Sequence, residues 1–185
     1  QGVLDVPAWN AQVRLKLNTI VNYIYYDSLA NPNQYTTALP VLELSLLKDV
    51  TLGKFHWDNQ LTYQVTGNSY VLPLPDLALR SNLYYKNKLF NVLWVQLGID
   101  TYFNTSYYTP AYMPATGRFY SQNERALGNY PLAHLYGNFQ LKRMRFFLMY
   151  YHVNKDLLPP YHFSALHYGA NPRFFKIGVS WNFYD

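Results

Sequence analysis

The chain has 185 residues and a formal net charge of +5, half of its residues are hydrophobic, and it contains no cysteine. It therefore has neither disulfides nor thiolate metal sites, and its basic residues are too scattered to form a nucleic-acid-binding run or helix. Charged residues make up only 14% and aromatic residues 19%. Aromatic residues favour strands and the ends of transmembrane strands. No break in composition divides residues 1–185, so we expect one domain.

Alternation of apolar and polar residues predicts strands along most of the chain, because successive side chains of a strand point to opposite faces. The clearest case is residues 55–66, where apolar or aromatic residues alternate with polar ones. The eight predicted strands are residues 12–26, 38–48, 55–66, 77–86, 90–103, 131–142, 145–154 and 173–184.

The connections between these strands alternate in length. Short turns are predicted at residues 87–88 and 143–144, and long loops at residues 27–37, 67–76, 104–130 and 155–172. The longest loop is rich in Pro and Gly, and we expect it to carry a short hairpin of its own.

Strands of this length, joined alternately by short and long connections, are typical of outer-membrane barrels with short periplasmic turns and long external loops. We therefore predict an all-β fold, an antiparallel up-and-down transmembrane β-barrel, in the bacterial outer membrane. Eight strands lie in this chain, and both chain ends are expected on the periplasmic side. A soluble β-sandwich is the alternative, although its strands are usually shorter.

The C-terminal third carries a family resemblance. Its residues are LGNYPLAHLYGNFQLKRMRFFLMYYHVN (127–154) and FKIGVSWNFYD (175–185), and residues 107–122 are similar to a long loop of the same family. These segments resemble the putative porin family of the Bacteroidetes phylum. Members of that family are longer than this chain, which implies that residues 1–185 could be the C-terminal part of a larger barrel. A closed barrel of about eight strands is filled by side chains, whereas about sixteen to eighteen strands leave a channel.

The end of the chain also resembles the β-signal by which outer-membrane proteins are recognised by the barrel-assembly machinery. Lys176, Gly178, Trp181 and Phe183 fill the positions of that signal. Tyr184 and Asp185 follow, whereas many such proteins end on the aromatic residue itself.

The polar faces of the predicted strands indicate which residues line the interior. These are Arg14, Lys16, Glu43, Asp58, Arg80, Asp100, His134, Gln140 and Lys176. With Lys86 and Lys142 included, positive charges are in excess, which would lower the barrier for anions in an open lumen. Lys86 and Lys142 flank short turns, however, and could instead sit at the periplasmic rim.

Metal binding and catalysis have little support in the sequence. The five histidines show no metal-ligand spacing. Ser164 lies near His162 and His167, but any loop of this composition offers such a pair, so we expect no enzyme activity, cofactor or metal. The loop aromatics could bind a sugar or a partner protein, although packing within the loop is favoured; they are Tyr107, Tyr108, Tyr112, Phe119 and Tyr120.

The function predicted from these patterns is that of a porin that allows passive diffusion of small polar solutes, with outer-membrane lipid around it. The alternative is a non-conducting barrel that serves as a structural or partner subunit of a larger outer-membrane complex. Its long aromatic loops would then contact the other subunits.

Overall fold

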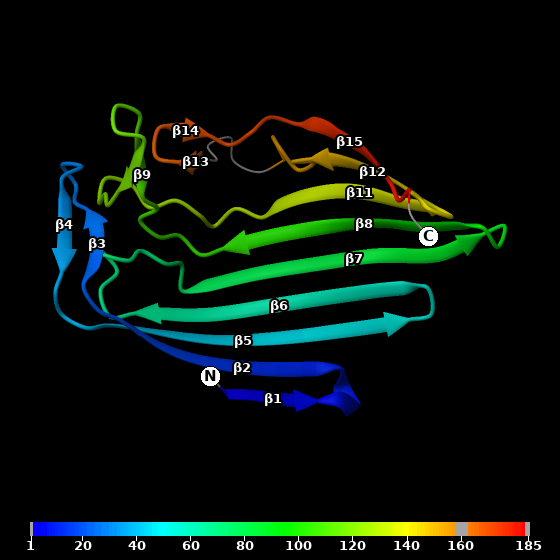
Figure 1. Cartoon of the computed structure of the whole chain (residues 1–185), viewed down its shortest axis with the longest axis horizontal. Coiled ribbons are helices and arrows are strands. Elements are labelled where there is room, and N and C mark those ends of the chain that lie inside the picture. Colours follow the sequence, from blue (N-terminus) through cyan, green and yellow to red (C-terminus); the bar gives the residue numbers. More distant parts are fainter. Residues whose placement is uncertain (1, 158–162, 184–185) are drawn as a thin grey trace.

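The computed structural model describes residues 2–157 and 163–183. Nine antiparallel strands form one sheet (Figure 1), in the order β1-β2-β5-β6-β7-β8-β11-β12-β15. They are β1 (Gly2–Val6), β2 (Ala11–Ile20), β5 (Leu39–Leu52), β6 (Phe55–Thr66), β7 (Leu77–Leu89), β8 (Leu93–Asn104), β11 (Leu132–Leu141), β12 (Met144–Tyr151) and β15 (Phe174–Trp181). The predicted all-β, up-and-down antiparallel order is confirmed. No helix of the described residues is long and apolar enough to cross a membrane.

Three small hairpins gather at one end of the strands of the sheet, and the short turns lie at the opposite end of the strands (Figure 1). The hairpins are β3 (Tyr23–Tyr26) with β4 (Pro32–Tyr35), β9 (Ala111–Met113) with β10 (Arg118–Tyr120), and β13 (Phe163–Ala165) with β14 (Tyr168–Gly169). The predicted alternation of short and long connections and the hairpin inside the longest loop are therefore confirmed. We call the boundary of the sheet at the first of these strand ends the long-loop edge and the boundary at the second the short-turn edge.

Several predicted boundaries were wrong, and three of them coincide with residues of left-handed backbone conformation. The strand predicted at residues 12–26 is broken at Asn22, whose φ of 55° is left-handed, and Tyr23 begins the β3–β4 hairpin instead. The turn predicted at residues 87–88 lies at Phe90 and Asn91, with φ of 49° and 56°. The last short turn is centred on Lys142, with φ of 51°, one residue before the predicted position.

Strand β1 was not predicted at all, because five residues are too few for a clear alternation. It pairs with β2 through a tight turn that contains a 3-10 helix (Pro7–Trp9). Gly2 lies opposite Leu15, part-way along β2, whereas β15 ends at the short-turn edge with Trp181 opposite Met144. The first described strand therefore begins part-way along the sheet, and the last one ends at the short-turn edge. The expected periplasmic position of both chain ends stays a prediction. Strands β1 and β15 are not paired with each other, so the sheet is open.

The register assigns every strand residue to one of two faces, because directly paired residues point to the same side. One face is apolar, as in the cross-strand row Val13, Leu46, Leu61, Leu79 and Phe103. The other is polar, as in the adjacent row Arg14, Ser45, Thr62, Ala78 and Asn104.

Burial on these two faces is the reverse of that in a soluble sandwich. On the apolar face Leu17 and Ile177 are 70% and 76% exposed, whereas Ser45 and His134 on the polar face are 2% and 5% exposed. A soluble sandwich buries its apolar faces against each other. The exposed apolar face therefore argues against the sandwich alternative.

Candidate functional site: the polar face of the sheet

All nine residues predicted to line the interior lie on the polar face. Lys16 pairs directly with Glu43, and Asp58 shares one cross-strand row with Asp100 and His134. The remaining ones, Arg14, Arg80, Gln140 and Lys176, fall on the same face by the register. The sequence reading placed these residues correctly relative to one another, because a strand period of two survives small errors in strand ends.

Four charged residues of this face were not predicted from the sequence. Asp5 lies on β1, where no strand was predicted, and pairs with Gln12. Asp49 lies beyond the end of the predicted strand 38–48, Lys88 was assigned to a turn, and Arg145 was placed at the first position of a strand. In the structure Asp49 lies directly opposite Asp58. Lys88 and Arg145 share the row that contains Trp94 and Gln140. Correct strand ends would have revealed the last three.

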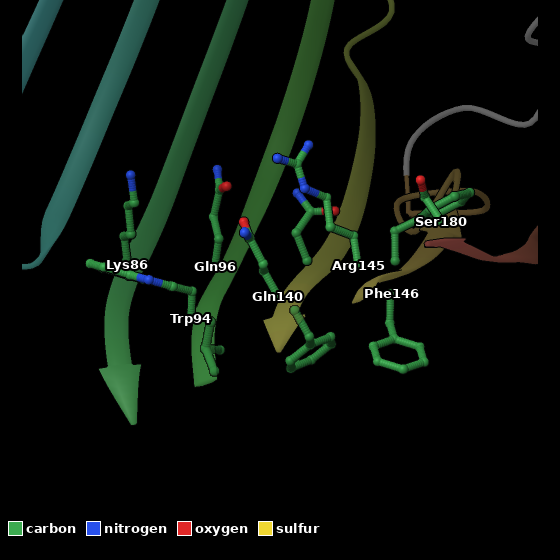
Figure 2. Close-up of a pocket in the computed structure, with 11 residues that line it drawn as sticks. Lys86, Trp94, Gln96, Gln140, Arg145, Phe146 and Ser180 are labelled. Carbon is green, nitrogen blue, oxygen red and sulfur yellow. The ribbon is translucent and has the colours of Figure 1, made fainter. Parts of the chain in front are cut away.

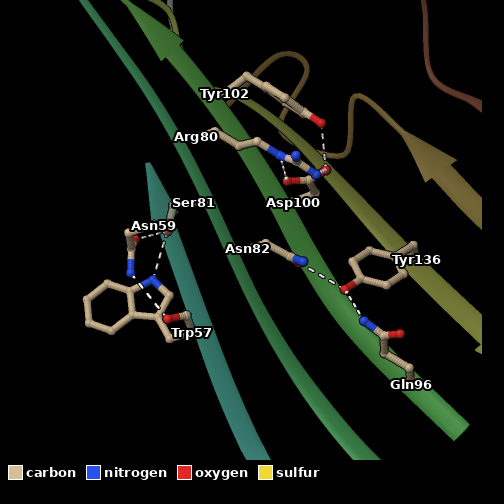
Figure 3. Close-up of polar contacts among 9 residues, drawn as sticks. All are labelled: Trp57, Asn59, Arg80, Ser81, Asn82, Gln96, Asp100, Tyr102 and Tyr136. Carbon is tan, nitrogen blue, oxygen red and sulfur yellow. Dashed lines mark hydrogen bonds and ion pairs between the residues drawn. The ribbon is translucent and has the colours of Figure 1, made fainter. Parts of the chain in front are cut away.

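Two ion pairs neutralise charges in the part of the face toward the long-loop edge. Lys16 Nζ lies 3.0 Å from Glu43 Oε1, and Arg80 Nε lies 3.4 Å from Asp100 Oδ1. The hydroxyl of Tyr102 also donates to Asp100 Oδ2, at 2.7 Å. The contacts of Arg80 are shown in Figure 3.

A neutral hydrogen-bond chain connects β7, β8 and β11 next to these pairs (Figure 3). Tyr136 donates its hydroxyl hydrogen to Asn82 Oδ1 at 2.9 Å and accepts one from Gln96 Nε2 at 3.0 Å. Gly98 lies beneath this chain, and a Cβ there would come within 2.8 Å of the Tyr136 hydroxyl and 2.7 Å of Tyr84 Cβ. A glycine is required at residue 98 for the Tyr136 ring to lie across the sheet.

Two histidines are held at the long-loop edge. His134 stacks on Tyr151, with ring centroids 4.0 Å apart, and its Nδ1 accepts the backbone N–H of His152 at 3.1 Å. His152 is 2% exposed, and its Nε2 lies 2.7 Å from the Tyr130 hydroxyl. Burial, with the charge of Asp156 nearby, raises the pKa of Tyr130. Through these contacts, the rings of His134 and His152 connect the loop residues to the strands of the sheet.

The part of the face near the short-turn edge is basic and hollowed. A cavity of about 600 Å³ is lined by residues of five strands, among them Lys86, Trp94, Gln96, Gln140 and Arg145. Figure 2 shows Lys86, Gln96, Gln140 and Arg145 pointing to one side of the sheet and Phe146 to the other. Such a surface offers hydrogen-bond donors and positive charge to a solute.

With this geometry established, the comparison with known families is informative. The family described as Putative porin matches residues 1–185. The chain belongs to this family. The match covers the whole chain, whereas the resemblance seen in the sequence rested on its C-terminal third. No curated protein and no solved structure matches the chain. In a porin one strand face is polar and the other apolar, as in this sheet.

The four residues that resemble a β-signal lie on β15 or just after it, and three of them, Lys176, Gly178 and Trp181, belong to the strand. Trp181 stacks on Phe183, with centroids 5.4 Å apart, and both rings are more than half exposed. Gly178 lies on the polar face, and an added Cβ would overlap the Phe147 ring. The Phe147 ring therefore occupies the space that a side chain at residue 178 would need.

The loop aromatics of the porin partly pack against one another. Tyr112 contacts Phe119 and Tyr168, with centroids 5.2 and 5.9 Å apart, and Tyr107 forms an isolated β-bridge to Leu127. Phe119 and Tyr108 remain 60% and 48% exposed. Some of these aromatic residues therefore pack within the loops. Phe119 and Tyr108 also expose enough of their rings to contact another molecule.

The residues considered for catalysis do not form a nucleophile and base pair among the described contacts. Ser164 Oγ donates to the carbonyls of Tyr168 and Gly169, at 3.3 Å each. His167 Nε2 lies 3.6 Å from Glu124 Oε2. His162 lies outside the described residues. Residues 2–157 and 163–183 contain no cluster of three or more potential metal-ligating side chains.

Proposed function

We propose that this chain forms the wall, or part of the wall, of an outer-membrane channel through which small polar solutes diffuse passively. The observation that carries the proposal is the separation of the two sheet faces over all nine strands. A hydrated polar face and an exposed apolar face are what a wall between water and lipid requires.

The open sheet supports a barrel with more wall than the described strands supply. Backbone N–H and C=O groups that face lipid without a partner each cost several kcal/mol, roughly, so open sheet edges do not occur in the bilayer. One edge of β1 and one edge of β15 have no partner strand among the described residues. We propose that further strands complete the ring between them, and that the result is wide enough for a water-filled lumen.

Transport through such a wall needs no covalent chemistry. Solutes would be sorted by size and by charged side chains of the polar face, and lipid would contact the leucines and aromatics of the other face. The short-turn edge would lie in the periplasm. The assembly machinery would recognise the end of β15, where the β-signal residues lie.

A second candidate is a non-conducting barrel that acts as a partner subunit. The observation in its favour is the layer of loops at the long-loop edge, where the backbone N–H of Ser121 donates to the Tyr26 carbonyl at 2.8 Å. Phe119 and Tyr108 are exposed on this layer. An ordered surface with exposed rings suits contact with another protein.

The deciding experiment is single-channel recording with the complete native polypeptide in planar bilayers. We expect stable open levels. Gln60→Trp adds bulk on the polar face and should lower the conductance by on the order of a tenth or more. Leu61→Trp is the matched control on the apolar face and should leave the conductance unchanged. Complete absence of open levels, together with a native mass near 21.8 kDa, would favour the partner subunit.

A further inference from the structure

Most cations of the polar face fall into two groups, and Arg14, whose Nε donates to Gln12 Oε1, belongs to neither. Lys16 and Arg80 are paired with carboxylates, at 3.0 and 3.4 Å. A second group has no ion pair with any described acidic side chain and lies on β7, β12 and β15. It consists of Lys86, Lys88, Arg145 and Lys176, which we call the basic sector.

The register places three members of the basic sector among neutral hydrogen-bond donors, whereas Lys176 lies in another row, opposite Met149. Lys88, Gln140, Arg145 and Ser180 occupy one cross-strand row with Trp94. Lys86, Gln96 and Asn138 occupy the next row of the same face. These two rows supply the polar lining of the 600 Å³ cavity near the short-turn edge, as seen in Figure 2.

Aromatic rings hold three of the four cations. The ammonium groups of Lys86 and Lys88 lie 5.8 and 5.5 Å from the centroid of the Trp94 ring. That of Lys176 lies 4.9 Å from the Tyr151 ring and 5.2 Å from the Phe174 ring. A ring stabilises an ammonium group without neutralising its charge. The positive charge therefore stays available to a solute.

Three acidic groups of the short-turn half lie on other strands of the face, and one of them, Asp5 on β1, accepts a hydrogen bond from Gln12. Asp49 and Asp58 are directly opposite each other on β5 and β6, and neither lines the cavity of the basic sector. These two carboxylates repel each other. They lie on β5 and β6, whereas the basic sector lies on β7, β12 and β15. No acidic side chain of the described residues lines the cavity, so none there repels an anion.

We propose that the basic sector makes this channel select small anions that carry a carboxylate or phosphate group. This inference rests on the proposed diffusion function. The anion would exchange water for N–H donors of Lys86, Arg145 and the glutamine amides, while cations would be repelled. The contact is solvated on one side, so the anion would bind weakly enough to pass on. Lys142, counted among the interior cations from the sequence, lies in a turn and is not part of the sector.

The test is the reversal potential of the complete native polypeptide in a potassium chloride gradient. We expect chloride to permeate better than potassium. The double variant Lys86→Gln with Arg145→Gln should lower the chloride-to-potassium permeability ratio by about twofold or more. Lys48→Gln is the matched control, because Lys48 shares the apolar face with Asn59. That control should leave the ratio unchanged.

A second measurement distinguishes binding of an anion at the basic sector from a general electrostatic attraction of anions to the channel. Inorganic phosphate should reduce the chloride current of the native channel and have a weaker effect on the double variant. Lys88→Gln alone provides the test if the double variant does not insert. Open channels that prefer potassium, or a ratio that neither variant changes, would overturn the inference and leave diffusion intact. A native polypeptide without open levels would instead overturn the proposed function.

Discussion

The two faces of the sheet bury opposite kinds of side chain. On the polar face Ser45, Asp100 and His134 are buried, whereas on the apolar face Leu17 and Ile177 are largely exposed. In a protein surrounded by water on all sides the hydrophobic effect would produce the reverse. This difference supports the proposed wall between water and lipid, and three pairs of substitutions test the description of the two faces.

The largest expected effect comes from a charge on the apolar face. Leu61→Arg should destabilise the folded barrel by about 2–4 kcal/mol if residue 61 faces the middle of a bilayer. Gln60→Arg, on the neighbouring residue of the polar face, should cost much less. Urea unfolding of the complete native polypeptide in lipid vesicles would measure both. Equal destabilisation by the two variants would show that the two faces do not differ in medium.

A smaller effect is expected from filling glycine positions on the two faces. Gly98→Ala places a methyl group against Tyr84 Cβ and the Leu83 carbonyl oxygen, at 2.7 and 2.8 Å, and neither atom can move easily. We expect a loss of about 1–3 kcal/mol in unfolding free energy. Gly137→Ala, on the apolar face, meets only side-chain atoms at 3.0 Å or more. Its loss should be smaller, and a reversed order would contradict the described packing of Tyr136.

The smallest effect concerns a polar group on the apolar face. Trp57 Nε1 donates to Ser81 Oγ, which donates to Asn59 Oδ1, both at 2.8 Å (Figure 3). Ser81→Ala should cost about 1 kcal/mol, because it leaves the Trp57 N–H without its partner. Thr101→Val, in the same cross-strand row, is the control, and we expect it to be neutral in the same unfolding assay. No loss in Ser81→Ala would mean that lipid headgroups or water satisfy Trp57.

Much of the fold could be predicted from the sequence because a strand period of two needs only local information. Residues 55–66 show this most clearly, since predicted and observed strand ends coincide. The break at Asn22 could not be predicted in this way, because Tyr23 and Tyr25 continue the same alternation inside a loop hairpin. Strand β1 was missed because it depends on pairing with β2 for its extended conformation.

The sequence by itself determined which side chains share a face and the antiparallel order of the strands, since these follow from alternation and from connection length. Only the tertiary structure decided which charges are neutralised. Lys16 meets Glu43 across 27 residues of sequence, and Arg80 meets Asp100 across 20. Lys86 and Arg145 meet no described carboxylate. Ion pairing depends on the cross-strand register, and the register is set by turns such as Phe90–Asn91, whose left-handed backbone has no counterpart in the hydrophobic pattern.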